Sequence, residues 1–175
     1  MAQEYLSDYF LKANERARQH IEPLPLNSSE VSELIELLKD PPAGSDTVLF
    51  NLLANRIPPG VDEAAKIKAE FLSEVAFGKV ESPLVSPEQA VELLGNMKGG
   101  YNVAPLISLL NDAELGEDAV DALEHTLMIY DAFDDVAKLA KEGSVNAKEL
   151  ISRWADASWF TSRDALPASR SYTVF

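Results

Sequence analysis

Apolar residues recur along most of the chain at the spacing of one face of an α-helix. One such stripe, at positions i, i+3, i+4 and i+7, consists of Val31, Leu34, Ile35 and Leu38. Similar spacing returns in the later stretches 67–75, 120–127 and 145–154. No comparable run alternates with period two before the last few residues, so the pattern predicts an all-α fold. About nine helices are expected, at roughly 2–20, 28–40, 45–56, 61–77, 87–97, 103–111, 116–130, 133–142 and 144–160.

Polar residues that cap helices precede several of these stripes. Asn27 and Glu30 have the spacing of a capping box, in which each side chain accepts a hydrogen bond from the other residue's backbone N–H. Ser86 and Gln89 repeat this spacing, with a proline at the first helical position. Asn102, which follows a Gly-Gly pair, is predicted to cap the helix after it.

Short helices joined by short connections tend to pack as antiparallel neighbours. After the first helix, the expected helices group into the pairs 28–56, 61–97, 103–130 and 133–160. The stretch from Pro105 to Asp112, with the apolar segment 119–123 behind it, resembles the HEAT-repeat pattern of two packed helices. We therefore expect an irregular HEAT-like helical-hairpin solenoid rather than a four-helix bundle.

The composition excludes several classes of function. The chain has 175 residues and no cysteine, so it offers no thiolate to a zinc ion, an iron–sulfur cluster or a nucleophilic mechanism. Its 29 acidic and 15 basic side chains give a formal net charge of −14, which disfavours nucleic acid and anionic membranes as partners. The first twenty residues do not resemble a secretory signal, and no apolar run is long enough to span a membrane. We therefore expect a cytoplasmic location.

The negative charge is concentrated in one part of the chain. Between Asp112 and Asp135 there are nine acids and no lysine or arginine: Asp112, Glu114, Glu117, Asp118, Asp121, Glu124, Asp131, Asp134 and Asp135. The last three stand at i, i+3 and i+4, a spacing that would suit a hard divalent cation if they shared a helical turn. Acids are also favoured in the first turn of a helix by its dipole, and we prefer this structural interpretation to a metal site. A surface for a basic partner would consist of Asp131, Asp134, Asp135 and Trp159.

No set of residues indicates catalysis, and no catalytic or cofactor-binding residue is assigned. Asp121 and His125 lie one helical turn apart, a geometry that can orient a catalytic imidazole. No cysteine exists and no serine has the context of a nucleophile, so we expect a structural histidine. Trp154 continues an apolar stripe and is expected in the core, whereas Trp159 is available to dock a neighbouring domain.

Several stretches together resemble a known family. They are 23–27 (PLPLN), 31–44 (VSELIELLKDPPAG), 55–65 (NRIPPGVDEAA), 82–107 (SPLVSPEQAVELLGNMKGGYNVAPLI) and 154–160 (WADASWF). On these residues the chain resembles the N-terminal HEAT-like domain of bacterial aconitase B, also called aconitate hydratase 2. The resemblance implies a HEAT-like domain over 1–160, followed at 161–175 by a linker and the start of a swivelling domain.

The resemblance also implies a function. The parent enzyme interconverts citrate and isocitrate through cis-aconitate, with a [4Fe–4S] cluster held in catalytic domains that this chain does not contain. This module is then expected to be non-catalytic, to recognise other proteins and to form a wall of the passage to the active site. Its expected partners are the catalytic and swivelling domains of its own enzyme, a second copy of the chain, or other metabolic enzymes.

Two other interpretations remain open from the sequence. The chain could be a free-standing HEAT-like adaptor protein that descends from this domain. It could also be an independent metal-dependent hydrolase that uses its clustered carboxylates, although those acids have the simpler structural explanation given above.

Overall fold

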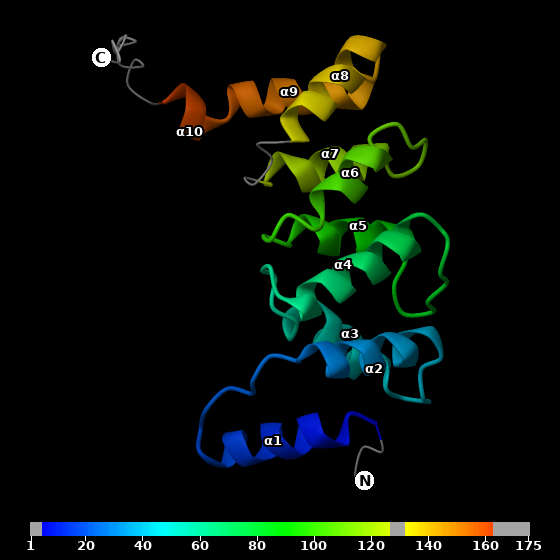
Figure 1. The fold of residues 1–175 in the computed structure, drawn as a ribbon, viewed down its shortest axis with the longest axis vertical. Coiled ribbons are helices and arrows are strands. Elements are labelled where there is room, and N and C mark those ends of the chain that lie inside the picture. Colours follow the sequence, from blue (N-terminus) through cyan, green and yellow to red (C-terminus); the bar gives the residue numbers. More distant parts are fainter. Residues whose placement is uncertain (1–4, 127–131, 163–175) are drawn as a thin grey trace, which may run out of the picture.

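The computed structural model describes residues 5–126 and 132–162, and in these residues the chain forms helices and no strands, which confirms the all-α prediction (Figure 1). The first four helices are α1 (Ser7–Arg18), α2 (Ser28–Lys39), α3 (Asp46–Asn55) and α4 (Glu63–Ala76). The next three are α5 (Pro87–Gly95), α6 (Val103–Leu109) and α7 (Gly116–Glu124). The last three are α8 (Phe133–Glu142), α9 (Val145–Asp156) and the single turn α10 (Ser158–Thr161).

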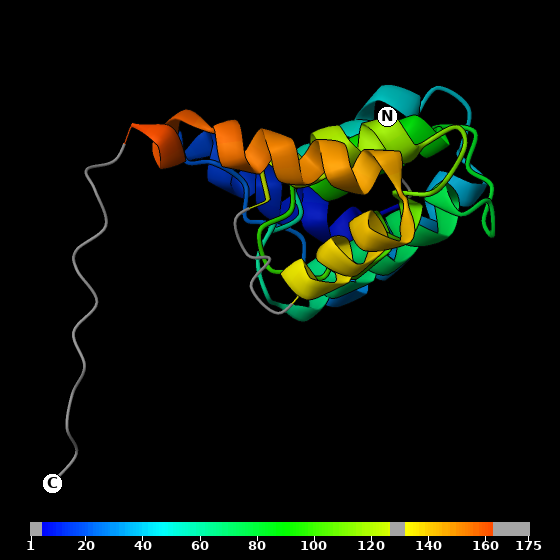
Figure 2. The same ribbon diagram turned by 90° about the horizontal axis from the view of Figure 1, so that it is seen from above.

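The helices stack in one column from α1 at one end to α8 and α9 at the other (Figure 1). Each expected pair is in contact, α2 with α3, α4 with α5, α6 with α7, and α8 with α9. Further contacts of α2 with α4, of α5 with α7 and of α7 with α9 join one hairpin to the next. The view along the column shows these helices largely overlying one another, with α10 extending beyond the others (Figure 2). The description of this stack as HEAT-like stays a prediction.

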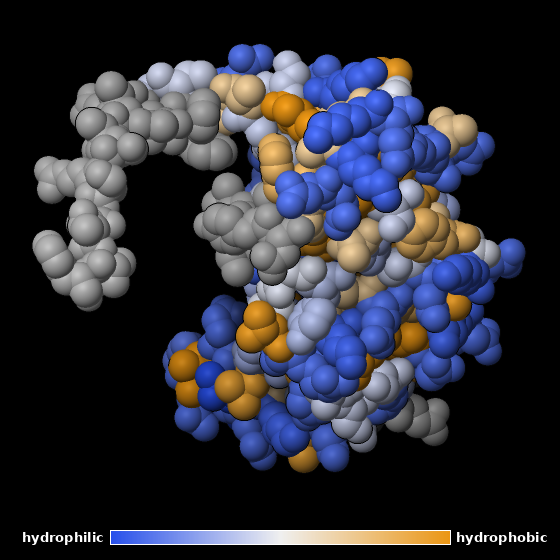
Figure 3. Space-filling view, turned by 45° about the horizontal axis from the view of Figure 1, so that its top comes forward, coloured by the Kyte–Doolittle hydropathy of each residue, from blue (hydrophilic) through white to orange (hydrophobic). Residues whose placement is uncertain are grey.

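Leucine dominates the core that runs through the stack. All four residues of the stripe predicted from 31 to 38 are buried in α2. The largest fully buried side chains are Leu6, Leu26, Leu34, Leu38, Leu49, Leu53, Leu72, Leu94, Leu106, Leu109, Leu110 and Leu123. The visible outer surface is mostly hydrophilic, with a few apolar patches (Figure 3). Burial of the apolar stripes is therefore the main source of stability, as expected for amphipathic helices.

Both predicted capping boxes are present. The Asn27 side chain accepts a hydrogen bond from the Glu30 N–H at 3.0 Å, and the Glu30 carboxylate accepts one from the Asn27 N–H at 2.9 Å. The reciprocal bonds of Ser86 and Gln89 measure 3.2 and 2.9 Å. These boxes fix the first residues of α2 and α5.

Asn102 is the N-cap residue of α6, as predicted, but its side chain makes no capping hydrogen bond to that helix. Its backbone already has helical angles (φ −82°, ψ −22°), whereas a capping side chain requires an extended backbone at that position. The buried amide instead donates hydrogen bonds back to the carbonyls of Leu94 at 2.8 Å and Met97 at 3.3 Å. The Asn102 side chain therefore bonds to the end of α5, while its carbonyl accepts from the Leu106 N–H at 3.1 Å at the start of α6.

Two other predicted helices end earlier than expected. The range 144–160 is interrupted at Ala157, whose extended ψ of 133° ends α9, while its carbonyl accepts from the Thr161 N–H at 3.0 Å and begins α10. The range 116–130 gives α7, which ends at Glu124 with His125 as its C-cap. The end predicted for that helix lies outside the described residues, as do residues 163–175, which hold most of the expected linker and start of a swivelling domain.

Four side chains close the carboxyl ends of helices in the preceding hairpin. Besides Asn102, the Ser82 hydroxyl donates to the Leu38 carbonyl at 2.6 Å. From α9, the Asn146 amide donates to the Leu110 carbonyl at 2.9 Å and the Trp154 indole to the Leu123 carbonyl at 3.3 Å. Carbonyls in the last turn of a helix lack the amide partner of a regular helical turn, and the Leu38 and Leu110 carbonyls obtain a donor in this way. The Leu94 and Leu123 carbonyls also accept from the N–H groups of Met97 and Thr126, both at 3.0 Å. We call Ser82, Asn102, Asn146 and Trp154 the cross-hairpin donors.

Two glycines allow neighbouring hairpins to pack closely, because neither position has room for a Cβ atom. A Cβ atom at Gly95 in α5 would lie 2.8 Å from the Cβ of Ala122 in α7. A Cβ atom at Gly99 would overlap the carbonyl of Gly60, in the connection between α3 and α4. A larger residue at either position would have to push two hairpins apart.

We expect Asn146→Ala to lower the free energy of unfolding by about 1–2 kcal/mol, because it leaves the Leu110 carbonyl without its donor. Chemical denaturation in urea measures this change. Asn96→Ala is the matched control, since the Asn96 amide bonds only to the exposed Glu92 carbonyl of its own helix. An equal loss in the two variants would contradict the structural role of the cross-hairpin donors.

Candidate functional site

A groove of about 570 Å³ lies between α5 and α7. Its lining includes the five carboxylates Glu88, Glu92, Asp118, Asp121 and Glu124, together with the side chain of His125. The spacing of three or four residues in each helix places these acids on facing surfaces. The close approach of Gly95 to Ala122 brings the two helices together at its floor. We call this feature the α5–α7 groove.

Arg153 in α9 neutralises one side of the groove. Its Nη1 atom lies 2.6 Å from Asp121 and 3.0 Å from Glu124, and its Nε atom lies 2.9 Å from Glu149. The hydrogen bond to Glu149, followed by those to the other two acids, raises the pKa of the guanidinium. Sequence reasoning missed this contact, because Arg153 lies 32 residues after Asp121 and no local pattern connects them.

The other side of the groove keeps its negative charge. Glu88, Glu92 and Asp118 form no ion pair with any residue in the described ranges 5–126 and 132–162. Burial raises the pKa of Asp118, and repulsion from Asp121, Glu88 and Glu117 adds to that effect. A hydrogen bond from Ser86 lowers the pKa of Glu88. This side of the groove is therefore an anionic surface on which a cationic group of a partner would relieve repulsion.

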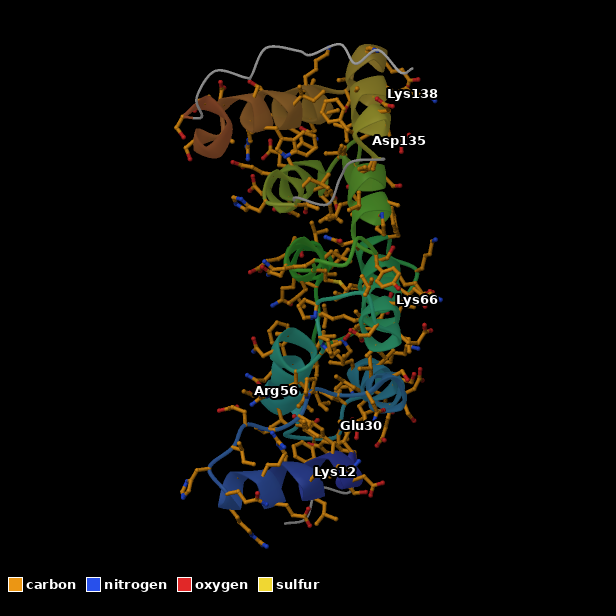
Figure 4. All side chains as sticks on the ribbon, turned by 60° about the vertical axis from the view of Figure 1, so that its left-hand side comes forward. Lys12, Glu30, Arg56, Lys66, Asp135 and Lys138 are labelled. Carbon is orange, nitrogen blue, oxygen red and sulfur yellow. The ribbon has the colours of Figure 1, made fainter. Side chains whose placement is uncertain are left out.

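The acids of the run 112–135 do not share one surface. Asp112 accepts hydrogen bonds from the N–H groups of Glu114 and Leu115, both at 2.9 Å, just before α7. Asp134 and Asp135 are exposed in the first turn of α8, where the helix dipole favours them. Figure 4 shows Asp135 and Lys138 on the side of the stack that carries Lys66, whereas α5 and α7 lie in the other layer.

The four residues named for a partner surface are only partly described. Asp131 lies outside the described residues, and so does the side chain of Trp159, whose backbone belongs to α10. Asp134 and Asp135 are the two members whose exposure the structure gives. The involvement of all four in one surface stays a prediction.

Neither aromatic nor histidine candidates form a catalytic arrangement in the described residues. Asp121 accepts its hydrogen bond from Arg153, and His125 is exposed at the end of α7. Trp154 is half-buried and packs against the edge of the core rather than at its centre. The centroids of the Trp154 and Phe133 rings lie 6.0 Å apart. The indole nevertheless has a structural role as a cross-hairpin donor.

The described side chains do not offer a metal or cluster site. Within residues 5–126 and 132–162, no group of three or more histidine, aspartate or glutamate side chains is arranged to hold a metal ion. The full sequence contains no cysteine, so its residues do not fit the ligand set of an iron–sulfur cluster. No helix in the same described part is long and apolar enough to cross a membrane.

Comparison with known families decides where this chain belongs. Residues 8–160 match the family described as the aconitate B N-terminal domain. The chain belongs to this family. The match covers every helix from the first turn of α1 to α10, so the stack and the α5–α7 groove both lie within the aconitate B N-terminal domain.

Similarity to individual proteins agrees with this assignment. The chain is 51% identical over 170 residues to aconitate hydratase B of Escherichia coli and 52% identical over 170 residues to that of Salmonella typhimurium. It is 45% identical over 172 residues to aconitate hydratase B of Synechocystis sp.. Each alignment covers 97% of this chain and 20% of the relative, so the chain spans about one fifth of the length of the curated relatives it matches.

One buried charge in this aconitate B N-terminal domain is not compensated. Lys68 on the inner face of α4 is 4% exposed and has no ion-pair partner in the described ranges 5–126 and 132–162. Its neighbours on that face include Ala65, Phe71 and Leu72. Burial lowers the pKa of its ammonium group to about 8, from an ordinary value of 10.5. The folded protein therefore binds this proton less tightly than the unfolded chain does.

We expect Lys68→Met to raise the free energy of unfolding by about 2–3 kcal/mol at pH 7. Because the folded-state pKa of Lys68 is lowered, the charged lysine reduces the free energy of unfolding by its full amount at pH values below about 8. This reduction disappears as the pH rises to 10.5, where the lysine is largely neutral in the folded protein. The difference between the variant and the wild type should therefore shrink across that pH interval. Denaturant unfolding at pH 7, 9 and 10.5 tests this, with Lys66→Met as control, since the Lys66 side chain is only half-buried and its ammonium lies 3.8 Å from Glu63. A difference that does not depend on pH would contradict the assignment.

Proposed function

We propose that this chain is the non-catalytic N-terminal domain of an aconitate hydratase B, and that it serves protein interaction and access to the active site. The parent reaction would be the interconversion of citrate and isocitrate through cis-aconitate. The proposal is supported by similarity along 97% of the chain to proteins named aconitate hydratase B. The domain boundary near residue 160 agrees with the matched range 8–160 and is part of the same proposal.

The chemistry of the parent enzyme would belong to other parts of the polypeptide. By the family resemblance, a [4Fe–4S] cluster serves the reaction there, and cysteine thiolates are the usual ligands of such a cluster. This chain has no cysteine with which to hold it. Its own residues would contribute recognition and shape, not proton transfer or bond cleavage.

The observation that carries the interaction role is the unpaired side of the α5–α7 groove. Glu88, Glu92 and Asp118 face an open groove, and Arg153 already satisfies the opposite side. A Lys or Arg side chain of a partner would find carboxylates there that are held by two packed helices. The partner would be a basic segment of another subunit, of the same enzyme or of a neighbouring metabolic enzyme.

The purified 175-residue chain should not turn over citrate or isocitrate, because it offers no ligand set for the cluster. After incubation with iron, sulfide and a reductant it should also show no iron–sulfur absorbance. The full-length enzyme, treated in the same way, is the positive control. Turnover of citrate or isocitrate by the short chain alone would contradict the proposal that this domain is non-catalytic.

Neutralising the unpaired acids should weaken partner binding. We expect the triple variant Glu88→Gln, Glu92→Gln, Asp118→Asn to lose at least about tenfold in affinity, and this loss should diminish as salt screens the charges. The amount of each partner that co-purifies with the tagged protein from its own cells, quantified by mass spectrometry at two salt concentrations, measures this loss of binding. Asp134→Asn with Asp135→Asn is the matched control from the other layer. A loss of partner binding in this control variant alone would contradict the groove as the interaction surface and would indicate α8 instead.

A further inference from the structure

One edge of the stack collects every second connection of the chain. Because the helices run back and forth, the connections 19–27, 56–62 and 96–102 lie on the same edge, at the left of Figure 1. The segment α10, where the described chain ends, also extends from this edge, as both ribbon views show (Figures 1 and 2). We call the three connections 19–27, 56–62 and 96–102 the exit edge.

The exit edge is built from connections that bond to one another. The Leu26 N–H donates to the Arg56 carbonyl at 2.8 Å, which joins the first connection to the second. The Lys98 N–H donates to the Pro59 carbonyl at 2.8 Å, and the Tyr101 hydroxyl donates to the Val61 carbonyl at 2.9 Å. A surface that is held in this way loses little conformational entropy when a partner binds.

Apolar side chains are exposed along this edge. The exposed fractions are 53% for Leu24, 74% for Val61 and 37% for Tyr101, and Ile21 is exposed beside them. Figure 3 shows apolar surface on the left-hand edge of the lower half of the molecule. Glu22, the acid within the first connection, is paired with Arg56 at 2.8 Å. Aromatic and aliphatic side chains with few free charges are typical of the centre of a stable interface.

The opposite edge differs in character. Its connections, 40–45, 77–86, 110–115 and 143–144, include Phe77, whose ring is covered by the Lys79 ammonium at 5.5 Å. Val145, the first residue of α9, is 77% exposed on this edge. The connection before it, 143–144, has no exposed large apolar side chain. Val145 therefore provides a matched control position on that edge.

We infer that the exit edge is the docking surface for the domain that follows this one in the same polypeptide. The inference rests on the proposed function, under which the relatives' remaining four fifths lie beyond this domain. The described chain leaves the stack on this edge, so the next domain would be tethered close to it. A tethered partner has a high effective concentration, and a modest apolar patch then suffices for stable docking.

Photo-cross-linking in the full-length protein tests the inference. A photoreactive phenylalanine analogue is placed at Val61, at Tyr101 and, as control, at Val145, and the linked peptides are identified by mass spectrometry. We expect Val61 and Tyr101 to link within one polypeptide to peptides beyond residue 175, at several times the yield of Val145. Links only between two copies, or yields equal to the control, would overturn the inference.

A charge placed on the edge gives a second readout. In the full-length protein, Val61→Glu with Leu24→Glu should speed proteolytic separation of this domain from the remainder by at least about fivefold, whereas Val145→Glu should not. Unchanged helical circular dichroism shows that the variant remains folded. An unchanged rate would overturn the inference. Citrate turnover and the length of the reading frame, measured separately, test the proposed function itself.

Discussion

The closure of helix carboxyl ends by side chains of another segment is the interaction on which the stack depends. A helix leaves its last carbonyls without amide partners, and a hairpin that stacks on it removes water from some of them. Ser82 and Asn146 supply missing donors across the hairpin boundary, and Trp154 adds a second donor to the Leu123 carbonyl, which also accepts from the Thr126 N–H. The apolar stripes supply most of the free energy, but the burial of apolar surface is non-directional and does not by itself fix the register between hairpins. The donors fix the register, because a shift would leave buried carbonyls unpaired at a cost of about 1–3 kcal/mol each.

Some residues bond to partners close in the sequence and others to partners far away, and this difference explains what could be predicted from the sequence. The all-α fold, the helix pairs and both capping boxes follow from residues within one or two turns of each other, such as Asn27 with Glu30. Asn102 has the residue type of a cap, but its partners depend on the path of the chain after α5. The contact of Arg153 with Asp121 joins α9 to α7 and has no local signal. The acids 112–135 form one run in sequence, yet α7 and α8, which carry most of the described ones, lie in different layers of the stack (Figure 4).

The α5–α7 groove and the exit edge suit different kinds of contact. The unpaired acids of the groove act over several ångströms, weaken with salt and favour rapid, reversible encounter with a basic partner. The apolar side chains of the exit edge act only at contact distance and favour lasting association. Under the proposed function the domain would need both properties, since it would stay attached to its own enzyme while other proteins bind and dissociate.

Helix α5 couples these two surfaces. It supplies Glu88 and Glu92 to the groove, its Gly95 determines how closely α7 approaches, and the connection after it carries Gly99 against Gly60 at the exit edge. Its start is fixed by the Ser86 capping box and its end by the Asn102 amide, so this short helix has little freedom to shift. A substitution that displaces α5, such as a larger residue at Gly95, would therefore alter the groove and the exit edge together.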